Sequence, residues 1–240
     1  MTELRTINLT HDGAALEGQL AVPEGPGPHP GVLVMSNAMG LGVQAREVAG
    51  RLAALGYVAL ATDMYGGGVH YGSMANVGPP VKQLFGDPAL LRSRVAAWHN
   101  LLKTLPQVDA ARTAAIGYCF GGQCVLDLAR SGADARAVVS FHGVLKTTMP
   151  AVAGKVKAHV AVYTGSIDPY APRADVEALR AELEAAGAKW QITEFGDVLH
   201  SFTDPNAAEI GAPGIGYDPL AHQLSWVGTV ALLEAMLKNG

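Results

Sequence analysis

The sequence predicts an α/β protein with a mainly parallel, doubly wound sheet that carries helices on both faces. Short apolar runs alternate along the chain with segments of helical periodicity, which is the order typical of parallel sheets. Several runs are apolar at every position, as expected for strands buried on both faces. The 240 residues are 49% hydrophobic and 16% charged, enough to form a large core. Because no repeat or convincing linker interrupts the pattern, residues 1–240 are interpreted as a single domain.

The apolar runs define the predicted strands. Residues 6–10 and 16–22 are predicted to pair through a turn at His11-Asp12-Gly13. Asp63 closes a buried strand over 57–62. The other predicted strands are 31–35, 110–118, 135–141, 158–164 and 189–195.

Glycine and proline mark the ends of the predicted helices. Gly56 ends the first helix, and Asp87-Pro88 begin another as cap and first turn. The segment 64–86 is instead predicted as a long glycine-rich loop, interpreted either as a lid or as a contact between two copies of the chain. The predicted helices are 43–55, 87–105, 120–130, 171–186 and 217–238, the last as one helix or two.

The most informative motif is Gly-Tyr-Cys-Phe-Gly-Gly over residues 117–122, between a predicted strand and a predicted helix. This is the pattern of a nucleophile elbow, with Cys119 in the place that serine usually takes. The flanking glycines allow a sharp turn, which presents the sulfur to backbone N–H groups and to a helix N-terminus. The motif therefore predicts that Cys119 is a nucleophile.

A thiol nucleophile needs a base and a group that orients the base. His200 and Asp168 each follow a predicted strand, and functional side chains of doubly wound sheets gather at the carboxyl ends of strands. The chain order is nucleophile, acid, histidine. We therefore predict a catalytic triad of Cys119, His200 and Asp168. Asp197 and Asp175 are less suitable acids, because the first is too close in sequence to His200 and the second lies within a helix.

An oxyanion hole is predicted from two backbone N–H groups. One belongs to Phe120, directly after the nucleophile, and the other to Ala38, in the loop after the strand over 31–35. In the same loop, Asn37 is interpreted either as a side-chain amide for the pocket or as a cap for the turn.

Composition excludes several classes of function. A net charge of −4 without any basic run gives no reason to expect nucleic acid as a partner. No secretory signal and no apolar run of about 18 residues is apparent, so we expect no membrane partner and a cytoplasmic protein. The spacing of Cys119 and Cys124 suits neither a redox pair nor a zinc site.

These motifs resemble the dienelactone hydrolase family, within the α/β-hydrolase fold, over essentially the whole chain. The resemblance rests on residues 117–122, on Gly165-x-x-Asp168-x-x-x-Pro172 and on His200-Ser201-Phe202. It implies a hydrolase without metal or cofactor that uses Cys119, His200 and Asp168.

The chain also departs from that family. Members that open dienelactone carry a glutamate where this chain has Asn37, and an arginine where it has Thr203-Asp204. The segment 64–91 contains no arginine either. Because a buried charge needs a partner, we expect a neutral ester or phosphotriester as substrate. The residues predicted to bind it are Asn37, Met39, Tyr65, His142 and Phe202.

Four other interpretations stay open. They are a dienelactone hydrolase proper, a metal-dependent hydrolase, a non-catalytic binding protein and a redox protein using Cys119 and Cys124. None of the eight histidines has the spacing of a metal site, so no metal is expected. If the segment 64–86 is a contact between two copies of the chain, the protein is a homodimer.

Overall fold

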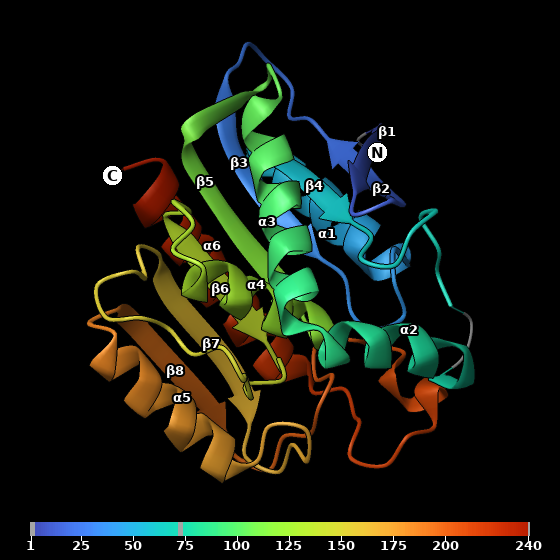
Figure 1. Cartoon of the computed structure of the whole chain (residues 1–240), viewed down its shortest axis with the longest axis vertical. Helices are drawn as coiled ribbons and strands as arrows, with labels where there is room; N and C mark the ends of the chain where they lie inside the picture. The colour runs from blue at the N-terminus through green and yellow to red at the C-terminus, as the bar shows by residue number, and fades with distance from the viewer. Residues whose placement is uncertain (1–2, 72–73, 240) are drawn as a thin grey trace.

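A computed structural model describes residues 3–71 and 74–239 of the chain. Its centre is an eight-stranded sheet in the order β1-β2-β4-β3-β5-β6-β7-β8 (Figure 1). The strands are β1 (Leu4–His11), β2 (Ala14–Ala21), β3 (His29–Met35), β4 (Val58–Thr62), β5 (Val108–Tyr118), β6 (Ala137–Phe141), β7 (His159–Gly165) and β8 (Lys189–Phe195). All eight strands were predicted, with bounds that differ by a few residues at the ends.

The first two strands form an antiparallel hairpin, and β2 continues antiparallel to β4. Asp12 and Gly13 turn the hairpin with positive φ angles of 49° and 72°, which suit Asp and Gly best. From β4 through β8 every neighbouring pair is parallel. The mainly parallel sheet predicted from the sequence is therefore observed.

The register of the parallel strands brings their carboxyl ends to one edge. Met35 of β3 pairs with Gly117 of β5, and Tyr118 pairs with Phe141 of β6. Gly165 of β7 pairs with Phe195 of β8. The segments that directly follow these strands therefore meet along this edge, which is where α/β sheets place their functional loops.

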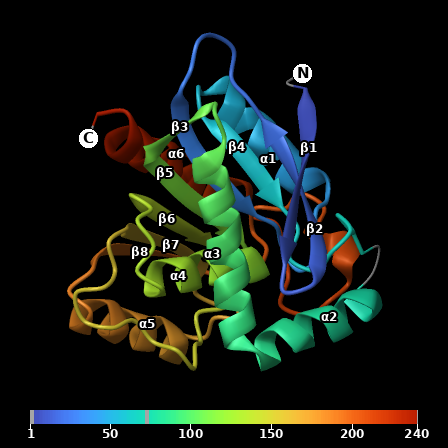
Figure 2. The same cartoon turned by 45° about the horizontal axis from the view of Figure 1, so that its top comes forward.

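Helices cover both faces of the sheet (Figures 1 and 2). The buried residues of α3, α4 and α5 belong to the core on one face, and those of α1 and α6 to the core on the other. Both cores combine small and branched apolar side chains with aromatic ones such as Trp98 and Phe141, which together fill the space between the layers. The helices are α1 (Val43–Ala54), α2 (Met74–Gly86), α3 (Pro88–Thr104), α4 (Phe120–Arg130), α5 (Arg173–Ala185) and α6 (Pro219–Leu237), with a short 3₁₀ helix over Ala207–Ile210.

The prediction that residues 64–86 form a loop throughout is wrong, because α2 occupies its second half. Pro79 and Pro80 lie inside α2. Because proline lacks an N–H and usually ends a helix, these two residues led the sequence analysis to predict a loop here. Val77 and Leu84 lie seven residues apart and are buried, so packing of one apolar face stabilises a helix that the local sequence disfavours.

The closing segment forms the single helix α6, which contacts β5 and β6. Contrary to the expectation of no long apolar segment, α6 is long and apolar enough to cross a membrane, with a mean hydropathy of 1.2 over 18 residues. Its buried residues recur every four positions and face the sheet: Ala221, Ser225, Thr229, Leu233 and Leu237. Helices that cover the core of a globular domain have the same length and composition.

Candidate active site

Cys119 lies at the turn between β5 and α4 and is the N-cap residue of that helix. Its backbone angles are φ 54° and ψ −115°, a region that residues with a side chain rarely occupy. The turn is held by the Cys119 N–H, which donates to the Phe141 carbonyl at 3.0 Å. Strain of this kind persists where the surroundings enforce it, and it aims the sulfur away from the sheet beside the first N–H groups of α4.

The glycines around Cys119 are required by close backbone approaches. A Cβ atom on Gly117 would lie 2.0 Å from the Gly121 carbonyl oxygen, and one on Gly121 would lie 2.2 Å from the Met35 oxygen. Both distances are far below van der Waals contact, so no larger residue fits without moving the backbone. The glycines thus pack the elbow against the end of β3 and against itself.

His200 and Asp168 meet at the same edge of the sheet. The His200 Nδ1 atom lies 2.8 Å from Asp168 Oδ2, and both residues are 2% exposed. Asp168 is oriented further by the Tyr170 N–H, which donates to its other carboxylate oxygen. The His200 backbone is fixed by hydrogen bonds with Gly214 and Gly216. The chain therefore brings together the histidine and the acid that the sequence analysis paired.

The pKa values of Cys119 and His200 shift in opposite directions. Burial raises the pKa of the Cys119 thiol, but the His200 charge and hydrogen bonds from His200, Phe120 and Ala38 lower it by more. Burial lowers the pKa of His200, whereas the Cys119 charge and the hydrogen bonds to Asp168 and Cys119 raise it to about 10. Both shifts act in the direction of a thiolate beside an imidazolium.

The two amides predicted as oxyanion donors both reach the sulfur. The backbone N–H groups of Phe120 and Ala38 hydrogen-bond to Cys119 and help to lower its pKa. Tyr65 fixes the loop that carries Ala38, because its hydroxyl donates to the Ala38 carbonyl at 3.0 Å. The Tyr65 ring also stacks on Phe120 at 5.9 Å between centroids, so one side chain contacts both donor residues.

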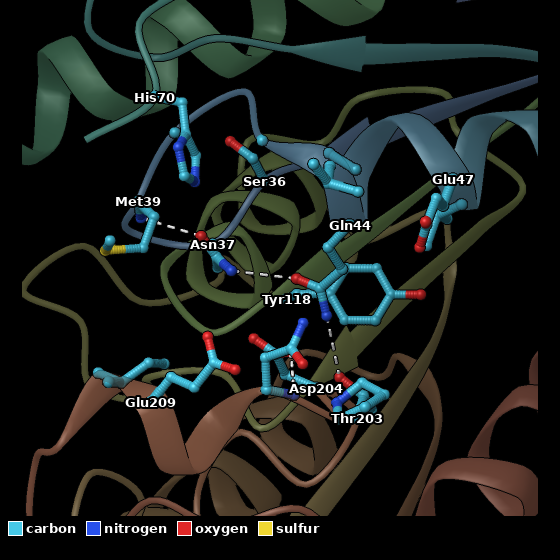
Figure 3. Close-up of a pocket in the computed structure, with 18 of the residues that line it drawn as sticks. Ser36, Asn37, Met39, Gln44, Glu47, His70, Tyr118, Thr203, Asp204 and Glu209 are labelled. Carbon is cyan, nitrogen blue, oxygen red and sulfur yellow. Dashed lines mark hydrogen bonds between the residues drawn. The ribbon is translucent and has the colours of Figure 1, made fainter. Parts of the chain in front are cut away.

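Asn37 holds the turn of the same loop. Its Oδ1 accepts the Met39 N–H at 2.9 Å, and its Nδ2 donates to Gln44 Oε1 at 3.0 Å. Asn37 and Met39 line a pocket of about 580 Å³, which Tyr118 and Thr203 also line (Figure 3). Asn37 therefore acts as a cap for the turn and also borders a cavity large enough for a small molecule.

His142 and Phe202, which were predicted to bind substrate, are both buried. Their exposed fractions are 1% and 0%. The His142 ring lies 5.1 Å from the rings of both His200 and Phe202. A residue at the end of a strand can turn its side chain either way, and only the packing decides which.

Three residues of the site were missed. The Tyr170 ring lies 4.7 Å from the His200 ring. Thr203 and Gln44 hydrogen-bond to each other and connect the loop after β8 to the start of α1. Tyr170 and Thr203 lie within three residues of Asp168 and His200, a signal that the sequence offered, whereas nothing local marks Gln44.

Both cysteines are free. Within residues 3–71 and 74–239, no group of three or more His, Cys, Asp or Glu side chains is arranged to hold a metal ion. Cys124 is fully buried, and burial together with the Asp127 charge raises its pKa well above the usual range. The electrostatic surroundings thus distinguish the two thiols, favouring ionisation of Cys119 alone.

The profile of the dienelactone hydrolase family matches residues 16–237. The chain belongs to the dienelactone hydrolase family. The predicted resemblance, the α/β-hydrolase fold and the prediction of a hydrolase that acts on ester bonds are thereby confirmed.

Relatives of known structure cover almost the whole chain. The dienelactone hydrolase-like promiscuous phosphotriesterase P91, from metagenomic libraries, is 36% identical over 98% of both chains, with a TM-score of 0.93. A structure named m3DLH is 39% identical over 99% of both chains, also with a TM-score of 0.93. A putative carboxymethylenebutenolidase of Escherichia coli O157:H7 is 28% identical, over 82% of this chain and 81% of its own.

Proposed function

We propose that the protein hydrolyses neutral, activated esters through a covalent intermediate on Cys119, with His200 and Asp168 completing a catalytic triad. The observation that carries the proposal is the buried contact of 2.8 Å between His200 and Asp168, next to a sulfur that two backbone amides also reach. This arrangement supplies a nucleophile, a base, an orienting acid and donors for a developing negative charge.

The first half of the reaction transfers the acyl group to the sulfur. The Cys119 thiolate attacks the carbonyl carbon, and the electron pair of the C=O bond moves onto oxygen. The Phe120 and Ala38 amides, which hydrogen-bond to the resting sulfur, stabilise this oxyanion; loss of one such donor typically costs about 10² to 10³ in rate. As the C–O bond to the leaving group breaks, the His200 imidazolium gives the departing oxygen its proton. A thioester and a neutral His200 remain.

The second half returns the enzyme to its resting state. Neutral His200 takes a proton from water, and the resulting hydroxide adds to the thioester carbon. The C–S bond then breaks, the carboxylic acid leaves, and the thiolate and imidazolium form again. Asp168 keeps the proton of His200 on Nδ1 during this step, so Nε2 is free to accept from water.

Aromatic side chains around the sulfur favour a neutral substrate. Tyr65 and Phe85 pack on Phe120 at 5.9 and 5.6 Å between ring centroids. No arginine occurs in residues 64–91, and this chain has Thr203-Asp204 where dienelactone-opening relatives carry an arginine. These two segments therefore offer a substrate carboxylate no arginine, and burying a carboxylate without a cationic partner is costly.

A neutral phosphotriester is the second candidate substrate. It is favoured by the likeness, at 36% identity and a TM-score of 0.93, to a protein described as a promiscuous phosphotriesterase. In that reaction the thiolate attacks phosphorus, a P–S bond forms and the P–O bond to the leaving group breaks. Water activated by His200 then cleaves the P–S bond.

The test measures turnover and the covalent adduct together. We expect wild-type protein to hydrolyse p-nitrophenyl esters and to show the added acyl mass on the Cys119 peptide after rapid quenching. Cys119→Ala removes both signals. Cys124→Ala is the matched control, because Cys124 is buried one turn along α4, and we expect it to keep both.

The other interpretations predict different results. Full activity of Cys119→Ala would refute the covalent mechanism. A dienelactone cleaved far faster than neutral esters and paraoxon would show that the carboxylate is recognised, against the argument from charge. A wild type that turns over none of these substrates would favour a binding protein.

A further inference from the structure

His142 is a buried titratable residue that the mechanism above does not use. It directly follows β6 with a φ of 38°, a strained value for a residue with a side chain, and its N–H donates to the Tyr163 carbonyl at 2.8 Å. Its ring meets the His200 ring at 69°, with 5.1 Å between centroids. Strain enforced next to a catalytic base suggests a function for the side chain.

A chain of hydrogen bonds connects His142 to the loop that carries Ala38. His142 Nε2 lies 2.8 Å from Thr203 Oγ1, which accepts from Gln44 Nε2 at 3.5 Å. Gln44 Oε1 in turn accepts from Asn37 Nδ2 at 3.0 Å. Figure 3 shows the links from Asn37 through Gln44 to Thr203 along one wall of the pocket.

His142 Nε2 contacts the Thr203 hydroxyl, so the direction of that hydrogen bond sets which nitrogen of the neutral ring carries the proton. The threonine hydroxyl has a single proton, and its oxygen already accepts from Gln44. The second lone pair of that oxygen can also accept from Nε2–H of His142; of the two directions, we take the one in which the hydroxyl donates to Nε2, an unprotonated acceptor. In that direction the proton of the neutral ring lies on Nδ1, which has no hydrogen-bond partner in the part of the chain that the structure describes.

We propose that His142 is a positioning residue, a neutral imidazole that packs against His200 and, through Thr203, couples the ring of the base to the loop of the Ala38 amide. The inference rests on the proposed function, because positioning matters only if His200 and Ala38 act on the same reacting group. Two loops that follow β3 and β8 must be placed together, and misplacement of catalytic groups is costly in rate.

Electrostatics agree with a neutral His142. Burial lowers its pKa well below the usual range, and the charge of His200 lowers it further, as does that of His222. The Tyr118 ring also lies near His142, at 6.2 Å between centroids, and burial raises the pKa of that phenol, so it carries no charge that would stabilise an imidazolium. The positive charge of the pair thus stays on His200.

The test compares this pair with a matched pair elsewhere in the chain. His99 and Thr113 are also buried, and His99 Nε2 lies 2.9 Å from Thr113 Oγ1, remote from the sulfur in α3 and β5. Thr203→Val and Thr113→Val each remove one hydroxyl that contacts an imidazole. Thr203→Ser keeps the hydroxyl and is the conservative variant.

We expect Thr203→Val to lower kcat about fivefold to tenfold with KM within about twofold, the loss that one positioning hydrogen bond implies. Thr203→Ser restores kcat, and Thr113→Val leaves kcat unchanged even where it lowers the melting temperature. A kcat of Thr203→Val equal to that of Thr113→Val would overturn the proposal, because both variants would then act on stability alone.

Nitrogen-15 NMR of labelled histidine supplies a readout that needs no turnover. We expect wild-type His142 to be protonated on Nδ1 across neutral pH and to lose this preference in Thr203→Val. Protonation of His142 on Nε2 in the wild type would refute the proposed hydrogen-bond direction. If the wild type hydrolyses no ester, the proposed function fails. The tautomer of His142 still tests the direction of its hydrogen bond with Thr203, because that measurement needs no turnover.

Discussion

Replacement of Asp168 by asparagine tests the electrostatic coupling of the site. The two unit charges of Asp168 and His200 are in contact at 2.8 Å between the nearest atoms and are withdrawn from water. At about 4 Å between charge centres and an effective dielectric constant of about 20, their attraction is about 4 kcal/mol, or about 3 pKa units, as an upper bound. The Cys119 charge raises the pKa of His200 more than Asp168 does, so we expect Asp168→Asn to lower that pKa by roughly 1 to 2 units.

The consequence for Cys119 has a defined sign. His200 with a lower pKa is less often charged, so it stabilises the thiolate less and the pKa of Cys119 rises. The pH at which iodoacetamide alkylates Cys119 at half its maximal rate should therefore increase. We expect kcat/KM for a p-nitrophenyl ester to fall by about 10³ to 10⁴, the loss typical of removing the acid of a triad.

Two other acids provide controls for this change. Asp175 lies in α5 and forms an ion pair with Lys146 at 3.6 Å. Asp197 lies in the loop after β8 with a φ of 58°, a conformation that asparagine also adopts. We expect Asp175→Asn and Asp197→Asn to keep nearly full activity. An Asp168→Asn variant with more than about a tenth of wild-type activity and an unchanged alkylation profile would refute the reasoning.

Two further predictions follow from single contacts. Tyr65→Phe removes the hydroxyl that donates to the Ala38 carbonyl at 3.0 Å, and we expect steady-state assays to show a kcat about two- to tenfold lower; an unchanged kcat would contradict the role given to this loop. Arg130→Met leaves the Glu182 carboxylate, which the Arg130 guanidinium contacts at 2.8 Å, without its cationic partner. Urea titration should show that the free energy of unfolding falls by about 3 to 5 kcal/mol, and the double variant Arg130→Met/Glu182→Leu should largely recover it. Burial raises the pKa of Glu182, but Arg130 lowers it by more. The stability that the ion pair contributes is therefore present above about pH 4.5 and is lost as the pH falls through the lowered pKa of Glu182. A free energy of unfolding of the wild type that does not change with pH in that range would be evidence against the pairing.

Much of the candidate site could be read from short segments. Gly117, Gly121 and Cys119 were identified because a nucleophile elbow has a local pattern, and the close approaches in the structure explain why glycine is needed. Asp168 and His200 were identified because each follows a strand whose apolar run is visible in the sequence. Their meeting then follows from the common direction of parallel strands.

The misses have a different physical origin. The helix α2 contains Pro79 and Pro80, so local preference favours a loop, and the burial of Val77 and Leu84 overrides it. His142 was expected to line the pocket because it follows a strand at the edge of the triad, but its ring is buried against Phe202 and His200. Both outcomes depend on neighbours that are distant in sequence.

The sequence by itself determined the alternation of strands and helices, the strained turn at Cys119 and the order of nucleophile, acid and histidine, because each is encoded by residues close together in the chain. Only the tertiary structure decided the hydrogen-bond chain from Asn37 to His142 and the ionisation of Cys119. A hydrogen bond between Gln44 and Thr203 joins residues 159 positions apart, and a pKa depends on every charge and every buried surface around the group. Such quantities exist only once the layers have packed.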